Sequence, residues 1–263
     1  MNDEAPLRWT DALRFAFGTL TALPVKVGRW DRAAARGGMA LAPLVGAVVG
    51  GLAGAAGGVL VALGASPLLA AVATVAVPAA LTRGLHLDGL ADTADGLGSG
   101  QPPARALDIM KQSDIGPFGV VTLLLVLLGQ VAALAACYGH GRVYGAAAAV
   151  VAGVMGRAAM TLACRRGVPA ARPGGLGAAV AGVLGAPTAW GVAAGCAALA
   201  CAAGAPFHGL TALRFLVAAA GSLLCAELLL RRCRTRFSGV TGDVFGALCE
   251  TAVTAALLIL SLR

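Results

Sequence analysis

Residues 39–82 contain no charged side chain, and this stretch constrains the fold more than any other feature of the chain. A helix needs about 20 apolar residues to cross a bilayer, so the stretch is long enough for two spans. The turn between them is expected at Gly64 to Pro67, where glycine and proline interrupt the apolar run. Only 12% of the 263 residues are charged, too few to cover the surface of a soluble protein of this size. We therefore predict a multi-span protein of the lipid bilayer.

Five further apolar stretches predict five more spans. Each is long and continuous rather than short and alternating, which favours helices over a β-barrel. The fold class is therefore predicted as all-α: a polytopic integral membrane bundle of about seven transmembrane helices. The additional spans are expected at residues 115–141, 143–164, 187–204, 210–230 and 244–262, with a short interfacial piece near 176–184.

The chain is expected to form a single membrane-embedded catalytic domain over residues 1–263. An N-terminal segment, residues 1–38, is expected to be cytoplasmic or interfacial, with a helix over residues 8–23 on the membrane surface. Basic side chains gather in this segment, in the loops that follow the second and fourth spans, and before the last span. Because cytoplasmic loops are enriched in Lys and Arg, these segments are predicted to face the cytoplasm.

The net charge of +8 is accounted for by these loops, and the chain has no basic tail, so no nucleic-acid partner is expected. The seven cysteines are scattered, without a C-x-x-C pair, which argues against a disulfide framework or a zinc site. Glycines four residues apart, such as Gly46 and Gly50, allow close helix packing either within one chain or in a homo-oligomer.

Three aspartates follow the second span, within the segment 83–116 that we take as the active-site segment. Asp88, Asp92 and Asp95 are spaced i, i+4, i+7, so they share one face of a helix. Three neighbouring carboxylates repel one another, and Mg²⁺ with its preference for oxygen ligands resolves this cost. The alternative is a solvated acidic face paired with nearby Arg. His86 either orients an aspartate, acts as an acid or base, or is a plain hydrogen-bonding residue.

Downstream of the aspartates, Lys111 is one of only two lysines in the chain. Beside an acidic metal site, a lysine suits phosphate neutralisation, and an interfacial anchor is its alternative role. Gly116 and Gly119 open the third span, where backbone N–H groups can approach a phosphate.

Two acids mark the last span. Asp243 and Glu250 are seven residues apart and share a helix face. Asp243 begins the span at the level expected for the three aspartates, so we predict that it completes the metal or nucleophile site, with Glu250 deeper as its support. The alternative is that Asp243 only caps its helix.

Residues 86–96 (HLDGLADTADG) and 109–119 (IMKQSDIGPFG) resemble the corresponding motifs of the cobalamin-5′-phosphate synthase family, also called adenosylcobinamide-GDP ribazoletransferases. The chain departs from the family pattern at three positions. Gln112 stands where an acid is frequent, Asp114 where a basic residue is frequent, and Ala22 where an Arg is common. The resemblance also extends to residues 23–25, 43–46, 172–177 and 239–247, and to Arg157 and Glu250.

The resemblance implies a Mg²⁺-dependent reaction at the cytoplasmic face of a bacterial inner membrane. Adenosylcobinamide-GDP is joined to α-ribazole or α-ribazole 5′-phosphate, and GMP is released. Phosphoryl transfer of this kind needs charge neutralisation and positioning more than covalent chemistry. The catalytic residues are then expected to be Asp92, Asp95, His86 and Asp243, the metal ligands Asp88, Asp92 and Asp95, the phosphate ligands Lys111, Arg105, Arg157, Arg172, Gly116 and Gly119, and the supporting residue Glu250.

A rival function is transport of a phosphorylated or anionic small molecule. Seven spans and the intramembrane acid Glu250 favour it. Internal repeats are expected in many transporters, and the sequence has no convincing one. The residues therefore favour the enzyme.

Overall fold

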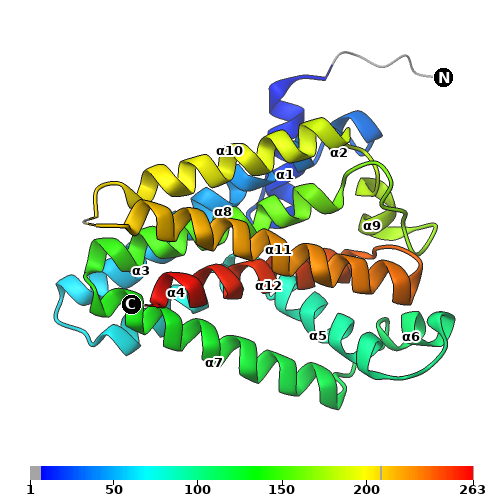
Figure 1. The fold of residues 1–263 in the computed structure, drawn as a ribbon. Helices are drawn as coiled ribbons and strands as arrows, with labels where there is room; N and C mark the ends of the chain where they lie inside the picture. Colours follow the sequence, from blue (N-terminus) through cyan, green and yellow to red (C-terminus); the bar gives the residue numbers. More distant parts are fainter. Residues whose placement is uncertain (1–6, 208, 263) are drawn as a thin grey trace.

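The computed structural model describes residues 7–207 and 209–262, and over these residues the protein is a bundle of α-helices without a β-strand (Figure 1). This confirms the predicted all-α class. The long helices of the bundle are α3 (Ala42–Ala62), α4 (Pro67–Leu81), α7 (Pro117–Gly139), α8 (Arg142–Ala163), α10 (Ala186–Gly204), α11 (Thr211–Phe237) and α12 (Gly242–Ser261). The shorter ones are α1 (Trp9–Leu20), α2 (Arg32–Ala40), α5 (Leu85–Gly98), α6 (Pro103–Ile109) and α9 (Gly175–Val180).

Six of the described helices, α3, α7, α8, α10, α11 and α12, are long and apolar enough to cross a membrane. The pair α4 and α5 adds a seventh if the bent pair is taken together. The expected turn after the first span is present: Gly64 has φ +90°, and the Ser66 hydroxyl accepts the Leu69 N–H at the start of α4. Glycine tolerates this left-handed conformation, which ends α3 and reverses the chain.

The sequence missed two helices and one boundary. Helix α2 and helix α6 lie in segments that we had left without secondary structure. Helix α11 continues to Phe237 instead of ending near 230, so the arginines that follow Leu230 lie on the helix rather than in a loop. Long basic side chains let a helix extend past the apolar layer, because their charged ends reach water while the stems pack.

Helices α8 and α12 form the centre of the bundle, since 72% and 56% of their most apolar windows are buried inside the protein. Helix α3 packs against α8 along a glycine face. A Cβ atom on Gly50 would lie 2.8 Å from the Ala149 carbonyl oxygen, and one on Gly54 would lie 2.7 Å from that of Ala146. The glycine spacing noted in the sequence therefore serves packing within the chain.

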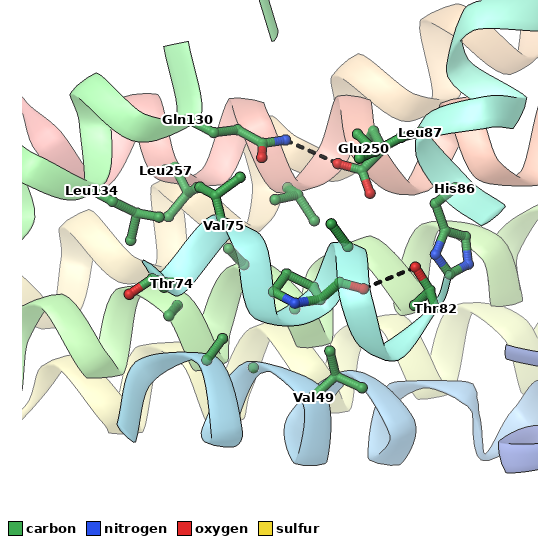
Figure 2. Close-up of a pocket in the computed structure, with 18 of the residues that line it drawn as sticks. Val49, Thr74, Val75, Thr82, His86, Leu87, Gln130, Leu134, Glu250 and Leu257 are labelled. Carbon is green, nitrogen blue, oxygen red and sulfur yellow. Dashed lines mark hydrogen bonds between the residues drawn. The ribbon is translucent and has the colours of Figure 1, made fainter. Parts of the chain in front are cut away.

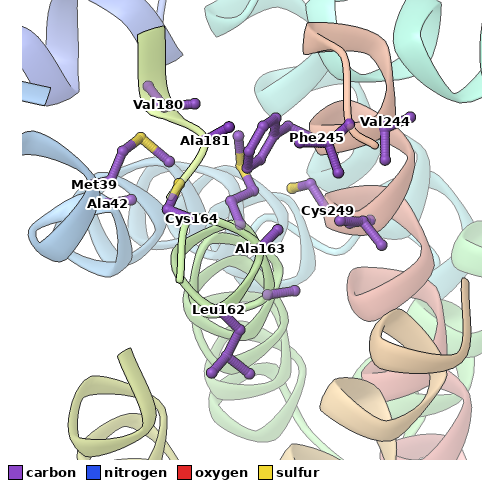
Figure 3. Close-up of a cluster of buried hydrophobic side chains, with 14 of the residues drawn as sticks. Met39, Ala42, Leu162, Ala163, Cys164, Val180, Ala181, Val244, Phe245 and Cys249 are labelled. Atoms are coloured by element: carbon purple, nitrogen blue, oxygen red, sulfur yellow. The ribbon is translucent and has the colours of Figure 1, made fainter. Parts of the chain in front are cut away.

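The core continues at one end of α8, where it meets α3, α9 and α12 (Figure 3). Figure 1 shows α6, α9 and the last turns of α11 at this end of the bundle, while the α3–α4 and α7–α8 turns lie at the other end. Three of the segments whose basic residues predicted a common membrane side thus lie together. The buried side chains of Figure 3 include Met39, Ala42, Leu162, Ala163, Cys164, Val180, Ala181, Val244, Phe245 and Cys249.

Candidate active site

The chain bends sharply between α4 and α5, and this bend places the aspartates. The two helix axes meet at 89°. Arg83 and Gly84 at the bend both have positive φ, 52° and 72°, a conformation that is costly for Arg and easy for Gly. In Figure 2, α4 runs alongside α3, and the chain changes direction at His86. Helix α4 alone is 15 residues long, so a seventh span requires the bent pair, and α5 continues from α4 almost at a right angle.

Helices α5 and α12 cross at very close range. A Cβ atom on Gly89 would lie 2.6 Å from the Asp243 carbonyl oxygen, and one on Gly246 would lie 2.9 Å from that of His86. Only glycine at both positions permits the two backbones to approach so closely. The start of α12 thus packs beside the Asp-rich helix, as the sequence predicted.

The carboxylates of Asp88, Asp92 and Asp243 act on one another in this crossing region. Asp88 is exposed, whereas Asp92 and Asp243 are partly buried. Burial raises the pKa of Asp92, the charges of Asp88, Asp243 and Asp95 raise it as well, and against the opposing effect of Arg172 it goes from 3.8 to about 7. A carboxyl group this strongly disfavoured as an anion is stabilised by a bound cation. The donor set therefore fits a hard divalent ion such as Mg²⁺, which prefers carboxylate oxygens.

Asp95 has a different environment from the other two aspartates of α5. It is 6% exposed, and its carboxylate accepts the backbone N–H groups of Gly116 at 2.8 Å and Gly119 at 2.9 Å. The first N–H groups of a helix lack partners within it, and Asp95 supplies them for α7. The glycine N–H groups that we expected to bind phosphate are thus engaged by Asp95. This buried carboxylate ties α7 to α5.

Two cavities flank the start of α5. One, of about 820 Å³, is lined by Asp88 and Asp92 together with Arg83, Gln112 and Asp114. The sequence had assigned no function to the last three residues. Asp114 stands where a basic residue is frequent in the family, so its position in the cavity with Asp92 could not be inferred from the motif. Asp88 also lines the second cavity and thus stands between the two.

The second cavity, of about 260 Å³, brings Asp88 and Asp243 together with Arg172 and His86. Arg172 donates to the carbonyl oxygen of Leu107, while its Nε atom is buried without a partner among the described residues. Gly174 and Gly175 line the same cavity through the segment before α9. The sequence analysis included that segment only in a motif of the family. Its run of glycines was the feature that could have indicated a cavity lined by backbone.

The other predicted phosphate ligands lie elsewhere. Lys111 is exposed and pairs with Asp108 at 3.9 Å, and Arg105 is exposed on α6. Neither lines the two cavities beside α5. Arg157 is buried inside the bundle, where its Nη1 donates to Cys249 Sγ at 2.8 Å. Of the four basic residues that we expected around the aspartates, only Arg172 lines these cavities.

Glu250 does not support Asp243 through a direct contact. Its carboxylate accepts a hydrogen bond from Gln130 Nε2 at 2.9 Å, as Figure 2 shows. It lines a third, smaller cavity of about 60 Å³ between α3, α4, α7, α8 and α12, together with His86 and Arg157. His86 lines both this cavity and the one that contains Asp243. Asp243 itself accepts a hydrogen bond from the Thr241 hydroxyl at 3.1 Å.

Comparison with known proteins supports one family. The family model of cobalamin-5-phosphate synthase matches residues 12–261. A relative named adenosylcobinamide-GDP ribazoletransferase from Frankia casuarinae is 43% identical over 95% of this chain and 94% of its own length. Relatives of the same name from Nocardioides sp. (40% identical, 94% of this chain, 97% of the relative) and Stutzerimonas stutzeri (39%, 95% and 98%) match equally fully. No solved structure gives a significant match.

The match covers both the Asp-rich helix and the start of α12, the two elements that meet at the flanking cavities. It also covers all of the long apolar helices. The chain therefore belongs to the cobalamin-5-phosphate synthase family and is a membrane-embedded transferase of cobalamin synthesis.

Proposed function

We propose that this protein joins adenosylcobinamide-GDP to α-ribazole or α-ribazole 5′-phosphate and releases GMP. The names of its relatives support this reaction. The observation that carries the proposal is the arrangement of Asp88, Asp92 and Asp243 with Arg172 around the cavities beside α5. A diphosphate substrate needs both a cation site and a basic neighbour, and the carboxylates and Arg172 at this end of the bundle are the groups that would supply them.

Asp88 and Asp92 are the proposed ligands of Mg²⁺. Both line the larger cavity, and a cation there would offset the burial and the neighbouring charges that raise the pKa of Asp92. Bound there, Mg²⁺ supplies positive charge to the diphosphate and to the departing phosphate of GMP. Both carboxylate oxygens of Asp95 already accept N–H groups at the start of α7. We propose that Asp95 holds α7 in place beside the site and is not itself a metal ligand.

Arg172 and Asp243 are proposed to serve the reacting groups. Arg172 pairs with a phosphate oxygen of the diphosphate through its guanidinium group. Asp243 receives the proton of the ribose 3′-hydroxyl on its carboxylate, which is held by Thr241. The 3′-oxygen then forms its bond to the corrinoid-side phosphorus, and the bond from that phosphorus to the oxygen of GMP breaks. The products are therefore the new phosphodiester, GMP and the proton held by Asp243.

The active end is proposed to face the cytoplasm of a bacterial inner membrane. Arg231, Arg234 and Arg236 at the end of α11 lie at the same end of the bundle as α6 and α9 (Figure 1). Enrichment of Lys and Arg on one side is typical of the cytoplasmic face. Both proposed substrates are water-soluble, polar molecules that would reach the site from that side.

The test is a reconstituted reaction. Protein purified in detergent or nanodiscs is mixed with adenosylcobinamide-GDP, α-ribazole and Mg²⁺, and GMP and the corrinoid product are measured by chromatography. We expect one GMP for each corrinoid joined, no reaction in EDTA, and a loss of several orders of magnitude for Asp92→Asn. Binding of the substrates without GMP release, together with their passage across proteoliposomes, would instead establish a transporter.

A further inference from the structure

A cluster of buried polar side chains lies inside the bundle, below the aspartates. We call it the Arg157 cluster, and it consists of His86, Arg157, Cys249, Glu250 and Gln130. These residues come from α5, α8, α12 and α7, so one cluster joins four helices. Figure 2 shows three of them, with the bond from Gln130 to Glu250 drawn.

Arg157 is the cation of this cluster. It is 3% exposed, its Nη1 lies 2.8 Å from Cys249 Sγ, and its Nη2 lies 3.4 Å from His86 Nδ1. Its charge also acts on Glu250. Burying a guanidinium within a membrane bundle is costly unless other groups compensate it, so such residues generally have a function.

The ligand atoms of His86, Cys249 and Glu250 lie within 4.8 Å of one another, a spacing that could hold a metal ion. The Arg157 guanidinium, however, already contacts two of these three side chains. A second cation among the same groups would be repelled by it. The chain thus provides its own cation where a metal would otherwise fit.

The cluster acts on the start of α5. His86 is the second residue of α5, directly after the bend at Arg83 and Gly84. A guanidinium has only donors, so His86 Nδ1 accepts the bond from Arg157. The same turn of α5 is pressed against α12 at Gly246. Any shift of this turn moves Asp88, two residues further on.

We propose that Arg157 is a positioning residue: through His86 and Cys249 it holds the first turn of α5 against α12 and so sets the spacing of the metal-binding carboxylates. This inference rests on the proposed cation site at Asp88 and Asp92. It replaces the role of phosphate ligand that the sequence suggested for Arg157. The buried charge is used to hold the first turn of a helix that begins at a bend of 89° from α4.

Mn²⁺ binding tests the proposal without an activity assay. Free Mn²⁺ is measured by electron paramagnetic resonance in the presence of the purified full-length protein. Arg157→Lys keeps the charge but cannot reach both partners, and Cys249→Ala removes one acceptor. Each is expected to weaken Mn²⁺ binding about 10- to 100-fold, the usual effect of losing a group that orients a metal ligand. Cys164→Ala, a buried cysteine of the core in Figure 3, is the matched control and should bind Mn²⁺ like the parent.

Two substitutions of His86 separate positioning from general damage. Asn places an acceptor near the position of Nδ1, whereas Leu fills the space without one. We expect His86→Asn to keep the affinity for Mn²⁺ close to that of the parent and His86→Leu to lower it. Equal affinities in both, with each variant folded as judged by size-exclusion chromatography, would overturn the proposal.

Two further results have distinct meanings. If Asp92→Asn binds Mn²⁺ as tightly as the parent, the proposed cation site itself is wrong, whatever Arg157 does. The last measurement is a metal analysis of protein purified without added metal. We expect no stoichiometric zinc or other transition metal. One equivalent that disappears in Cys249→Ala would show that a metal, not Arg157, organises the cluster.

Discussion

The backbone N–H of Gly116 donates to the carboxylate of Asp95 at 2.8 Å, across 21 positions of sequence. This bond, with its partner from Gly119, joins the start of α7 to the last turns of α5. The motif presents Asp95 as one of three equivalent metal ligands. Its two hydrogen bonds to α7 give it a structural role that Asp88 and Asp92 do not have. The three aspartates should respond differently to substitution.

Asp95→Ala is expected to destabilise the protein, because it leaves two N–H groups without their acceptor. Losing the partner of a buried donor costs roughly 1–3 kcal/mol. The apparent melting temperature in detergent should fall clearly, and Asp92→Asn should not lower it, because that change removes a repelled charge. Equal melting temperatures for Asp95→Ala and the parent would contradict the capping role.

The effect of Mg²⁺ on stability should depend on pH. The pKa of Asp92 is raised from 3.8 to about 7 in the folded protein, so its protonated form contributes stability that is complete below about pH 4 and is lost as the pH rises through 7. Mg²⁺ competes with this proton, and the increase in melting temperature that it causes should grow between pH 6 and pH 8. Thermal unfolding with Mg²⁺ and with EDTA measures this difference. In Asp92→Asn, the stabilisation by Mg²⁺ should change much less between pH 6 and pH 8. If its pH dependence is the same as in the parent, another group is responsible for it.

The crossing of α5 and α12 should not tolerate a side chain. Gly89→Leu would place carbon atoms where the Asp243 backbone lies, so the helices must separate. We expect GMP release to fall at least about tenfold, because spacing errors near 1 Å are enough to cost catalysis heavily. Gly51→Ala on α3, whose added Cβ would meet nothing within 4 Å, is the control. Normal turnover in Gly89→Leu would show that the crossing does not position the site.

Arg172 and Lys111 should differ sharply, although the sequence suggested the same role for both. Arg172 lines the cavity with Asp88 and Asp243, whereas Lys111 is exposed and pairs with Asp108. Arg172→Ala should lower kcat/KM by roughly 100- to 1000-fold, as expected when a group that stabilises the reacting phosphate is lost. Lys111→Ala should change it by less than about threefold, the effect of an exposed pair. Steady-state kinetics of the two variants measures these changes. A larger loss in Lys111→Ala than in Arg172→Ala would place the phosphate site near α6 instead.

The spans were predictable because they depend on local composition. The turn at Gly64 and the last span at Asp243 follow from interrupted apolar runs, and the structure has both. The shared helix face of Asp88 and Asp92 follows from spacing alone. These features need no knowledge of which helices are neighbours.

The contacts that differ from expectation all depend on tertiary neighbours. Arg157 lies near a span end in a motif and looks like a phosphate ligand, but α5 and α12 surround it. Asp95 has the spacing of a metal ligand, and its hydrogen-bond partners are N–H groups at the start of another helix. The glycine spacing on α3 was too common to interpret until α8 was seen against it. A charge or a small residue can be read from sequence, whereas its partner cannot.

The right angle between α4 and α5 has a consequence for the depth of the aspartates. Seven residues of helix rise about 10 Å, so on a spanning helix Asp95 would lie roughly one third of the hydrocarbon thickness away from Asp88. Because α5 is bent by 89° from α4, this rise runs across the direction of α4 rather than along it, and we expect the two carboxylates at similar depth. At similar depth, the proposed metal ligands would be reached together from the membrane surface. A bulky substrate would then not have to enter the lipid for the proposed reaction.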